Sequence, residues 1–344
     1  MRNLSIGKNS ALLITDRQAR KYLTGVDIAE GFLVVEKAMT TLTDARYFSA
    51  AKITLNSVGV NAILYQGENS LKKFLSTLKI KTLLVDFNKT TVAEYKTYSA
   101  FGYKIKDCAA MLERSLSIKT NDELDKIKRA CAIAEKAFHK AIKTVTVGIS
   151  ELELKERIEN LYFELGADGV AFETIVAFGA NGAVPHHETG ETKLTANTPI
   201  LIDMGCTVGG FCSDLTRTAF FGSPTEKFVN CYNAVKTANQ LAIENIYSNM
   251  RAKDADAIAR NYLKEKGLDK YFTHSLGHGL GLRVHEYPTL SKKRDYKLVD
   301  KMVFTIEPGV YFDGEFGIRI EDTVVLENGK VERLYTDDKE LLIL

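Results

Sequence analysis

The chain has 344 residues, with 46 lysines and arginines against 44 aspartates and glutamates, so its formal net charge is +2. This balance argues against nucleic acid or an anionic membrane surface as a partner. Five cysteines without a C-x-x-C pair do not suit a secreted disulfide framework or a structural zinc site. With no apolar run of about 18 residues and no recognisable secretory signal, we expect a cytoplasmic protein of about two domains.

The first 110 residues alternate short apolar runs with helix-like stretches, which favours an α/β layer with substantial parallel strand pairing. The segments that carry this pattern are residues 31–37, 46–55, 61–67, 70–78 and 81–87. This half holds no cluster of residues suited to chemistry. We expect the charges of its segment TDARYF to cap or solvate a helix rather than to form a binding edge.

A long amphipathic helix is predicted after a domain boundary at about 110–120. Thr120 and Glu123 match a capping box, in which a hydroxyl and a carboxylate satisfy each other's free backbone N–H groups. Apolar residues then follow at three- and four-residue spacing. A second capping box, at Ser150, begins a helix that ends near Gly166.

The same organisation recurs further along the chain. Ser223 is the expected N-cap of another long helix, with Pro224 at its first position, and a fourth helix is predicted over 253–266. Each helix pair precedes two strand-like segments, which are 200–205 and 211–221 after the first pair and 303–312 and 317–326 after the second. The repeat of helix, helix and hairpin indicates an internal duplication.

Each of those four strand-like segments carries an acid within an apolar run: Asp203, Asp214, Glu307 and Glu321. Any one of them alone is best explained as a strand end that faces water. Four at equivalent places need a shared counter-charge, because burying an unpaired carboxylate costs several kcal/mol. Since only Arg217 and Arg319 lie within a few residues, a metal cation is the better balance.

A glycine-rich segment between the two acidic hairpins, THSLGHGLGLRVHEYP, carries His274, His278 and His285. Gly277 and Gly279 permit the close backbone approach that a tight ligand-bearing segment needs. Two divalent cations held by four carboxylates and one imidazole would be electrically neutral. Such oxygen-rich coordination suits Mn²⁺, Co²⁺ or Fe²⁺ and also accepts Zn²⁺.

The motifs FETIVAFGANGAVPHH, LIDMG, GGFCSDLTRT, SLGHGLGLRVHEYP, FTIEPGVY and GIRIEDT resemble those of the pita-bread dinuclear metallopeptidases. Within that group they are similar to the proline-specific branch, Xaa-Pro dipeptidase (prolidase) and aminopeptidase P. The resemblance implies an α/β creatinase-like N-terminal domain over residues 1–115. Over 116–344 it implies an α+β pita-bread catalytic domain with an internal pseudo-two-fold duplication.

The same resemblance implies roles for individual residues. The metal ligands would be Asp203, Asp214, His278, Glu307 and Glu321. Asp214 and Glu321 would bridge two ions per chain, Asp203 would bind one of them, and His278 with Glu307 would bind the other. Mn²⁺ is the first expectation for both ions.

The remaining catalytic roles implied by the resemblance fall on two histidines, an arginine and one of the ligands. His186 and His285 would bind substrate and polarise the scissile carbonyl, and His186 is preferred to His187 because it directly follows the proline of the motif. Glu307 would shuttle a proton, and Arg319 would orient the ligands. His274 and His139 match no catalytic position and are expected to be structural.

The expected activity is removal of an N-terminal residue from short peptides with proline in second position, by a homodimer. Thr289 stands where better-known prolidases often carry an arginine, which leaves the choice between dipeptides and longer peptides open. The alternatives are a methionine aminopeptidase-like enzyme, a metal-free creatinase-like hydrolase and a non-catalytic pita-bread peptide-binding module. The extra N-terminal domain argues against the first, and the intact ligand set argues against the other two.

Overall fold

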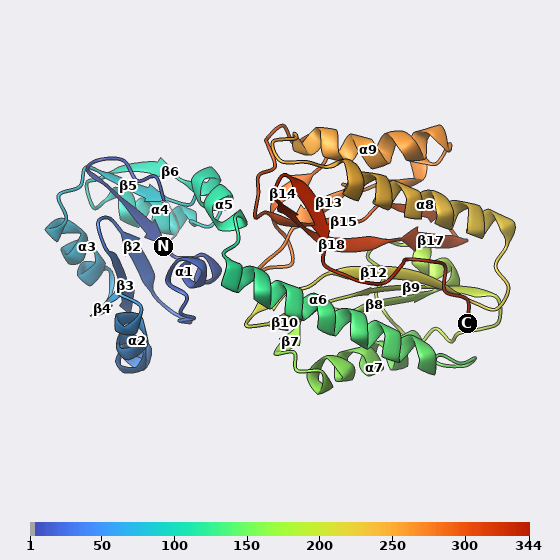
Figure 1. The fold of residues 1–344 in the computed structure, drawn as a ribbon. Coiled ribbons are helices and arrows are strands. Elements are labelled where there is room, and N and C mark those ends of the chain that lie inside the picture. The colour runs from blue at the N-terminus through green and yellow to red at the C-terminus, as the bar shows by residue number, and fades with distance from the viewer. Residues whose placement is uncertain (1–3) are drawn as a thin grey trace. The chain divides into compact units, whose positions relative to one another are not determined.

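The computed structural model describes residues 4–344, and the chain divides into two compact units, Met1–Leu116 and Ser117–Leu344 (Figure 1). Among the described residues, no helix combines the length and apolar character needed to cross a membrane.

The N-terminal unit is a six-stranded mixed sheet with strand order β4-β3-β2-β1-β5-β6. Its strands are β1 (Ser10–Ile14), β2 (Phe32–Val35), β3 (Met39–Thr43), β4 (Asn61–Leu64), β5 (Thr82–Val85) and β6 (Lys104–Asp107). Its helices are α1 (Arg17–Thr24), α2 (Ala45–Ser57), α3 (Glu68–Thr77), α4 (Val92–Ser99) and α5 (Ala109–Ser117). The pairs β1–β5, β5–β6 and β3–β4 are parallel, which confirms the substantial parallel pairing expected from the alternating pattern.

Both faces of this sheet are covered. Leu12 and Leu33 belong to one core cluster and Leu13 and Val34 to a second, as expected when successive side chains of a strand point to opposite faces. The segment TDARYF caps a helix, as predicted, because the Asp44 carboxylate accepts a hydrogen bond from the first turn of α2.

The C-terminal unit contains four long helices in two pairs, α6 (Asn121–Ala141) with α7 (Glu151–Glu164) and α8 (Glu226–Asn245) with α9 (Ala252–Glu265). Three short 3₁₀ turns accompany them: η1 (Ile142–Thr144), η2 (Gly179–Ala183) and η3 (Asp269–Tyr271). Both predicted capping boxes are present at the starts of α6 and α7. The predicted N-cap of the third helix is wrong. Thr225, not Ser223, caps α8, because its hydroxyl accepts from the Phe228 N–H; Pro224 therefore precedes the helix instead of occupying its first position, and the Ser223 N–H donates to the Asn197 side chain.

The main sheet of this unit is antiparallel, with strand order β14-β13-β15-β18-β12-β9-β8 and with β19 also paired to β18. Its strands are β8 (Ile175–Phe178), β9 (Thr198–Met204), β12 (Leu215–Phe221), β13 (Gly277–Gly279), β14 (Glu286–Leu290), β15 (Val303–Ile306), β18 (Glu321–Glu327) and β19 (Lys330–Arg333). Smaller sheets hold β7 (Gly169–Val170), β10 (Cys206–Val208) and β11 (Phe211–Cys212), and β16 (Gly309–Phe312) with β17 (Phe316–Arg319). The helices α6 and α7 lie along one half of the curved sheet and α8 and α9 along the other (Figure 1).

The two halves meet where β12 pairs with β18, so each hairpin contributes one strand to the centre of the sheet. Three of the four predicted strand segments are interrupted at or next to their acid. Asp214 lies between β11 and β12, Glu307 lies between β15 and β16, and Glu321 opens β18 after the break that follows β17. These interruptions place the acids where the backbone changes direction, at the middle of the sheet.

Candidate metal centre

Three neighbouring strands bring two of the predicted ligands into one row. Thr216 on β12 is paired with Asp203 of β9 on one side and with Glu321 of β18 on the other. Residues directly opposite each other on adjacent strands present their side chains on the same face of a sheet. The Thr216 hydroxyl accordingly lies between the two acids and donates to Glu321 Oε2 at 2.5 Å.

The other three predicted ligands approach this row from segment ends. Asp214 immediately precedes β12, Glu307 immediately follows β15, and His278 is the central residue of β13. His278 Nε2 lies 3.5 Å from Asp214 Oδ2 and 3.3 Å from Glu307 Oε1. The structure therefore brings all five predicted ligands to one region of the sheet.

The glycines around His278 are required by the packing of the backbone. A Cβ atom at Gly277 would lie 1.9 Å from the Thr305 carbonyl oxygen, and one at Gly279 would lie 2.3 Å from that of Tyr287. No larger residue fits such approaches without movement of the backbone, so the close approach expected from the sequence is confirmed.

Three features of this arrangement suit a divalent cation. Asp214, His278 and Glu321 each offer a ligand atom, and these atoms all lie within 4.8 Å of one another. Asp203 Oδ1 is buried and accepts no hydrogen bond from the described residues, although a buried acceptor is normally satisfied. Carboxylate oxygens with one imidazole are the donors that hard and borderline divalent metals prefer.

The pKa shifts of the same groups also favour a bound cation. Burial, together with neighbouring carboxylates, raises the pKa of Asp214 and of Glu321 well above the usual range, and burial raises the pKa of Glu307. Burial also lowers the pKa of His278. The site thus disfavours uncompensated negative charge, and a bound cation would stabilise the ionised carboxylates.

Arg319 is buried, donates directly to one of the acids and is linked to a second through a threonine hydroxyl. Its NH2 group donates to Asp203 Oδ2 at 2.6 Å, and its Nε donates to the Thr216 hydroxyl that in turn holds Glu321. Its NH1 group donates to the Tyr311 hydroxyl at 2.8 Å. These contacts hold the Asp203 carboxylate and the hydroxyl beside Glu321 in place, and the role of Arg319 in orienting metal ligands stays a prediction.

Two further side chains lie at the site: Tyr311, for which the sequence motifs predict no role, and His274, for which the sequence predicts a structural role. His274 Nε2 lies 2.9 Å from the Tyr311 hydroxyl, and its Nδ1 lies 3.9 Å from Glu307 Oε2. Its ring is therefore adjacent to a predicted ligand. The sequence T-H-S-L-G-H could have indicated that His274 lies near the ligands, because His274 precedes β13 and lies four residues before His278.

His186 and His285 are the predicted substrate-binding histidines, and both are exposed. The His285 ring centroid is 4.2 Å from that of His278. Desolvation, with His278 and His186 as neighbours, lowers the pKa of His285 to about 4, so it is neutral at pH 7. His285 thus lies at the cluster, and its neighbour His186 lies on the loop that follows η2.

That loop is held by a buried acid that the sequence analysis missed. Glu151, in the first turn of α7, accepts hydrogen bonds from the Phe178 N–H, the Asn181 side chain and the Gly190 N–H. His187 Nε2 lies 2.9 Å from its second oxygen. Of the two adjacent histidines, His187 is therefore the one tied to the scaffold, which leaves His186 less constrained.

Comparison with known proteins places both units in families. Residues 125–328 match the model of metallopeptidase family M24, and residues 5–115 match the creatinase/prolidase N-terminal domain. The uncharacterized peptidase YqhT of Bacillus subtilis is 33% identical over 340 residues, which cover 97% of this chain and 95% of that protein. An Xaa-Pro dipeptidase of Pyrococcus furiosus is 41% identical over 225 residues, 65% of each chain.

Solved structures agree with this assignment. An Xaa-Pro dipeptidase from Bacillus anthracis superposes with a TM-score of 0.92 at 31% identity, covering 97% of this chain and 95% of that one. An X-Pro aminopeptidase from Thermotoga maritima gives a TM-score of 0.88 at 31% identity, covering 97% of each chain. These matches confirm the predicted creatinase-like and pita-bread folds. The chain belongs to metallopeptidase family M24, and it is a hydrolase of a family that uses divalent metal ions, with Asp214, His278 and Glu321 as a candidate metal site.

Proposed function

We propose that this protein is a metal-dependent exopeptidase that hydrolyses the bond between an N-terminal residue and a following proline. The observation that carries the proposal is the convergence of Asp214, His278 and Glu321 within 4.8 Å, beside an Asp203 oxygen without a hydrogen-bond partner among the described residues. The similar proteins named Xaa-Pro dipeptidase and X-Pro aminopeptidase support the proline specificity.

We propose two divalent cations per chain, with Mn²⁺ first and Co²⁺, Fe²⁺ or Zn²⁺ as alternatives. They would be held by Asp203, Asp214, His278, Glu307 and Glu321. When bound, the cations would lower the pKa of a shared water and polarise the substrate carbonyl. The rest of the chemistry is the task of side chains.

Glu307 is proposed to take a proton from the attacking water and to deliver it to the leaving proline nitrogen. The Thr305 hydroxyl donates to Glu307 Oε1 at 3.0 Å, and it also accepts from the His278 N–H. Thr305 therefore fixes the carboxylate relative to the histidine ligand.

His285 and His186 are proposed to bind the substrate carbonyl and to stabilise its developing oxyanion. A neutral imidazole carries one N–H donor, and His285 is neutral over the whole range in which the enzyme would work, since its pKa is lowered to about 4. The His285 loop is braced by Glu286, which accepts from the Arg283 N–H and pairs with the buried Lys119.

Substrate length is the finer question. Thr289 on β14 lies opposite His278, and a neutral hydroxyl would hold the free carboxylate of a dipeptide less well than an arginine would. The loss of about 1–2 kcal/mol corresponds to roughly a tenfold weaker preference for dipeptides. We therefore propose that Xaa-Pro-Yaa peptides are cleaved comparably with Xaa-Pro, by a homodimer.

The test is kcat/KM for Ala-Pro and Ala-Pro-Ala after loading with each candidate metal, with Ala-Ala-Ala as the control peptide. Similar values for the two proline peptides, and no cleavage of the control, are expected. Cleavage of Ala-Pro alone would make the protein a strict dipeptidase. Cleavage of a peptide with N-terminal methionine before alanine would indicate a methionine aminopeptidase-like enzyme. Metal binding without any hydrolysis would indicate a peptide-binding module.

A further inference from the structure

On the face of the sheet opposite the metal ligands, β12 and β18 bury a second set of charges. Because side chains alternate along a strand, Arg217 and Asp322 point away from the face that carries Thr216 and Glu321. Arg217 is 4% exposed and Asp322 is fully buried. Arg217, one of the two nearby cations noted in the sequence, therefore compensates charge on the opposite side of the sheet from the metal ligands.

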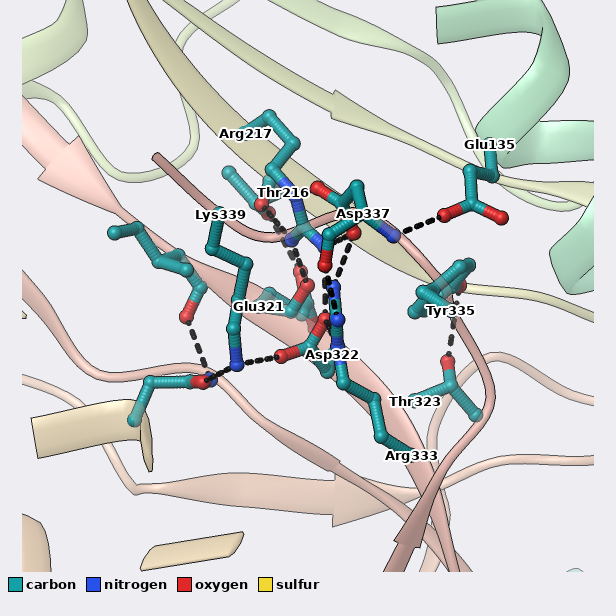
Figure 2. Close-up of polar contacts among 12 residues, drawn as sticks. Glu135, Thr216, Arg217, Glu321, Asp322, Thr323, Arg333, Tyr335, Asp337 and Lys339 are labelled. Atoms are coloured by element: carbon teal, nitrogen blue, oxygen red, sulfur yellow. Dashed lines mark hydrogen bonds and ion pairs between the residues drawn. The ribbon is translucent and has the colours of Figure 1, made fainter. Parts of the chain in front are cut away.

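Residues 333–339, which begin with the last residue of β19 and are called here the C-terminal segment, cover this opposite face (Figure 2). Asp337 accepts a two-pronged contact from Arg217, with distances of 2.6 and 2.8 Å. Arg333 Nε donates to Asp322 Oδ1 at 2.8 Å, and Lys339 Nζ donates to Asp322 Oδ2 at 2.9 Å. Three cations and two carboxylates thus form one buried cluster.

The segment is also anchored from the helix layer. Glu135 on α6 accepts from the backbone N–H groups of Thr336 and Asp337, at 2.7 and 2.8 Å. Asn239 on α8 accepts from Lys339 Nζ at 2.6 Å. Charges buried in this way are tolerated because each one is paired, and removal of one partner leaves the other unpaired. The position of the segment is therefore closely specified.

Several of these contacts end on the backbone of the ligands themselves. The Tyr335 hydroxyl donates to the Asp214 carbonyl at 2.5 Å, and the Thr323 hydroxyl donates to the same oxygen at 2.8 Å. Arg217 NH1 donates to the Glu321 carbonyl at 2.6 Å (Figure 2). The C-terminal segment thus contacts the peptide group of Asp214 directly, through Tyr335, and that of Glu321 indirectly, through Arg217, which is paired with Asp337.

We propose that the C-terminal segment is a positioning element of the metal centre. Through Tyr335 and through the cluster built on Arg217 and Asp322, it fixes the backbone at Asp214 and Glu321 and so sets the separation of their carboxylates. The inference rests on the proposed metal centre. Groups that orient ligands from behind typically contribute 10–100-fold to metal affinity, and we expect about tenfold for the Tyr335 hydroxyl because Thr323 shares its acceptor.

The test compares two variants that each delete one buried tyrosine hydroxyl. Tyr335→Phe removes the donor to Asp214, whereas Tyr232→Phe removes a donor to the Lys339 carbonyl, 3.1 Å away in the same segment but not on a ligand. Metal-free protein is titrated with Mn²⁺ by calorimetry, and the visible absorption spectrum of the Co²⁺ form reports the coordination geometry. We expect a roughly tenfold higher Kd and an altered spectrum for Tyr335→Phe, and wild-type values for Tyr232→Phe.

A third variant, Asp337→Asn, keeps the shape of the side chain and removes the charge shared by Arg217 and Arg333, so it tests the cluster should Tyr335→Phe not fold. It is expected to raise the Mn²⁺ Kd as well. Folded Tyr335→Phe and Asp337→Asn proteins with wild-type Kd and spectrum would overturn the inference, and so would an equal loss in Tyr232→Phe. A wild-type protein that binds no metal would instead overturn the proposed metal centre itself.

Discussion

Replacing Glu151 by glutamine should release the loop that carries His186. The Glu151 side chain is fully buried, and its two oxygens receive four contacts, from Phe178, Asn181, His187 and Gly190, at 2.7 to 3.2 Å. Glutamine has nearly the same shape but replaces one acceptor oxygen with an NH₂ group. His187 can adapt by changing its tautomer, whereas a backbone N–H cannot.

The magnitude follows from these contacts. At least one backbone N–H then faces an NH₂ group and is left without a partner, which costs about 1–3 kcal/mol, and the remaining bonds lose their charge assistance. A total of about 3 kcal/mol corresponds to a fall of roughly 6–12 °C in melting temperature for a unit of this size. Since His186 is proposed to bind the substrate carbonyl, kcat/KM should fall at least about tenfold.

Thermal unfolding and Ala-Pro hydrolysis should be measured side by side for Glu151→Gln and a control, Glu153→Gln. Glu153 lies on the same helix and accepts a hydrogen bond from the Ser150 N–H, but its side chain is half exposed. The control should change both quantities only slightly. The reasoning would be refuted if Glu151→Gln melted like the control, or if it lost stability but hydrolysed Ala-Pro at the wild-type rate.

Three further results are expected. Asp214→Asn should lose at least one metal ion per chain and lower turnover by several orders of magnitude, and elemental analysis showing full metal content with near-normal turnover would contradict the ligand assignment. Chelation should lower the melting temperature, increasingly so above about pH 5. Acids such as Asp214 and Glu321, whose pKa is raised in the folded apo-protein, are stabilising below the pKa of the unfolded chain and lose that contribution as the pH rises toward the folded pKa; scanning calorimetry at several pH values checks this, and a pH-independent effect of chelation would count against it. The buried thiols of Cys131, Cys206 and Cys212, whose pKa burial raises to about 12, should resist iodoacetamide in the native protein at pH 8, and mass spectrometry showing rapid alkylation there would disprove their burial.

Local patterns in the sequence determined much of this protein. The capping boxes at Thr120 and Ser150 needed no tertiary information, because their partners lie three residues apart. Acids inside apolar strands, together with glycines around His278, predicted a metal centre because buried charge requires compensation wherever the strands lie.

Contacts between distant segments could be decided only by the tertiary structure. The sequence shows Arg217 three residues from Asp214, but its side chain lies on the opposite face of the sheet, where the pairing of β12 with β18 and the return of the chain bring it to Asp322 and Asp337. Glu151 likewise appears as an ordinary first-turn acid until the fold brings a loop some 27 to 39 residues away onto it. Strand register and helix packing determine which charged side chains meet. A sequence pattern that repeats every two to four residues does not encode a contact between residues that lie about a hundred positions apart.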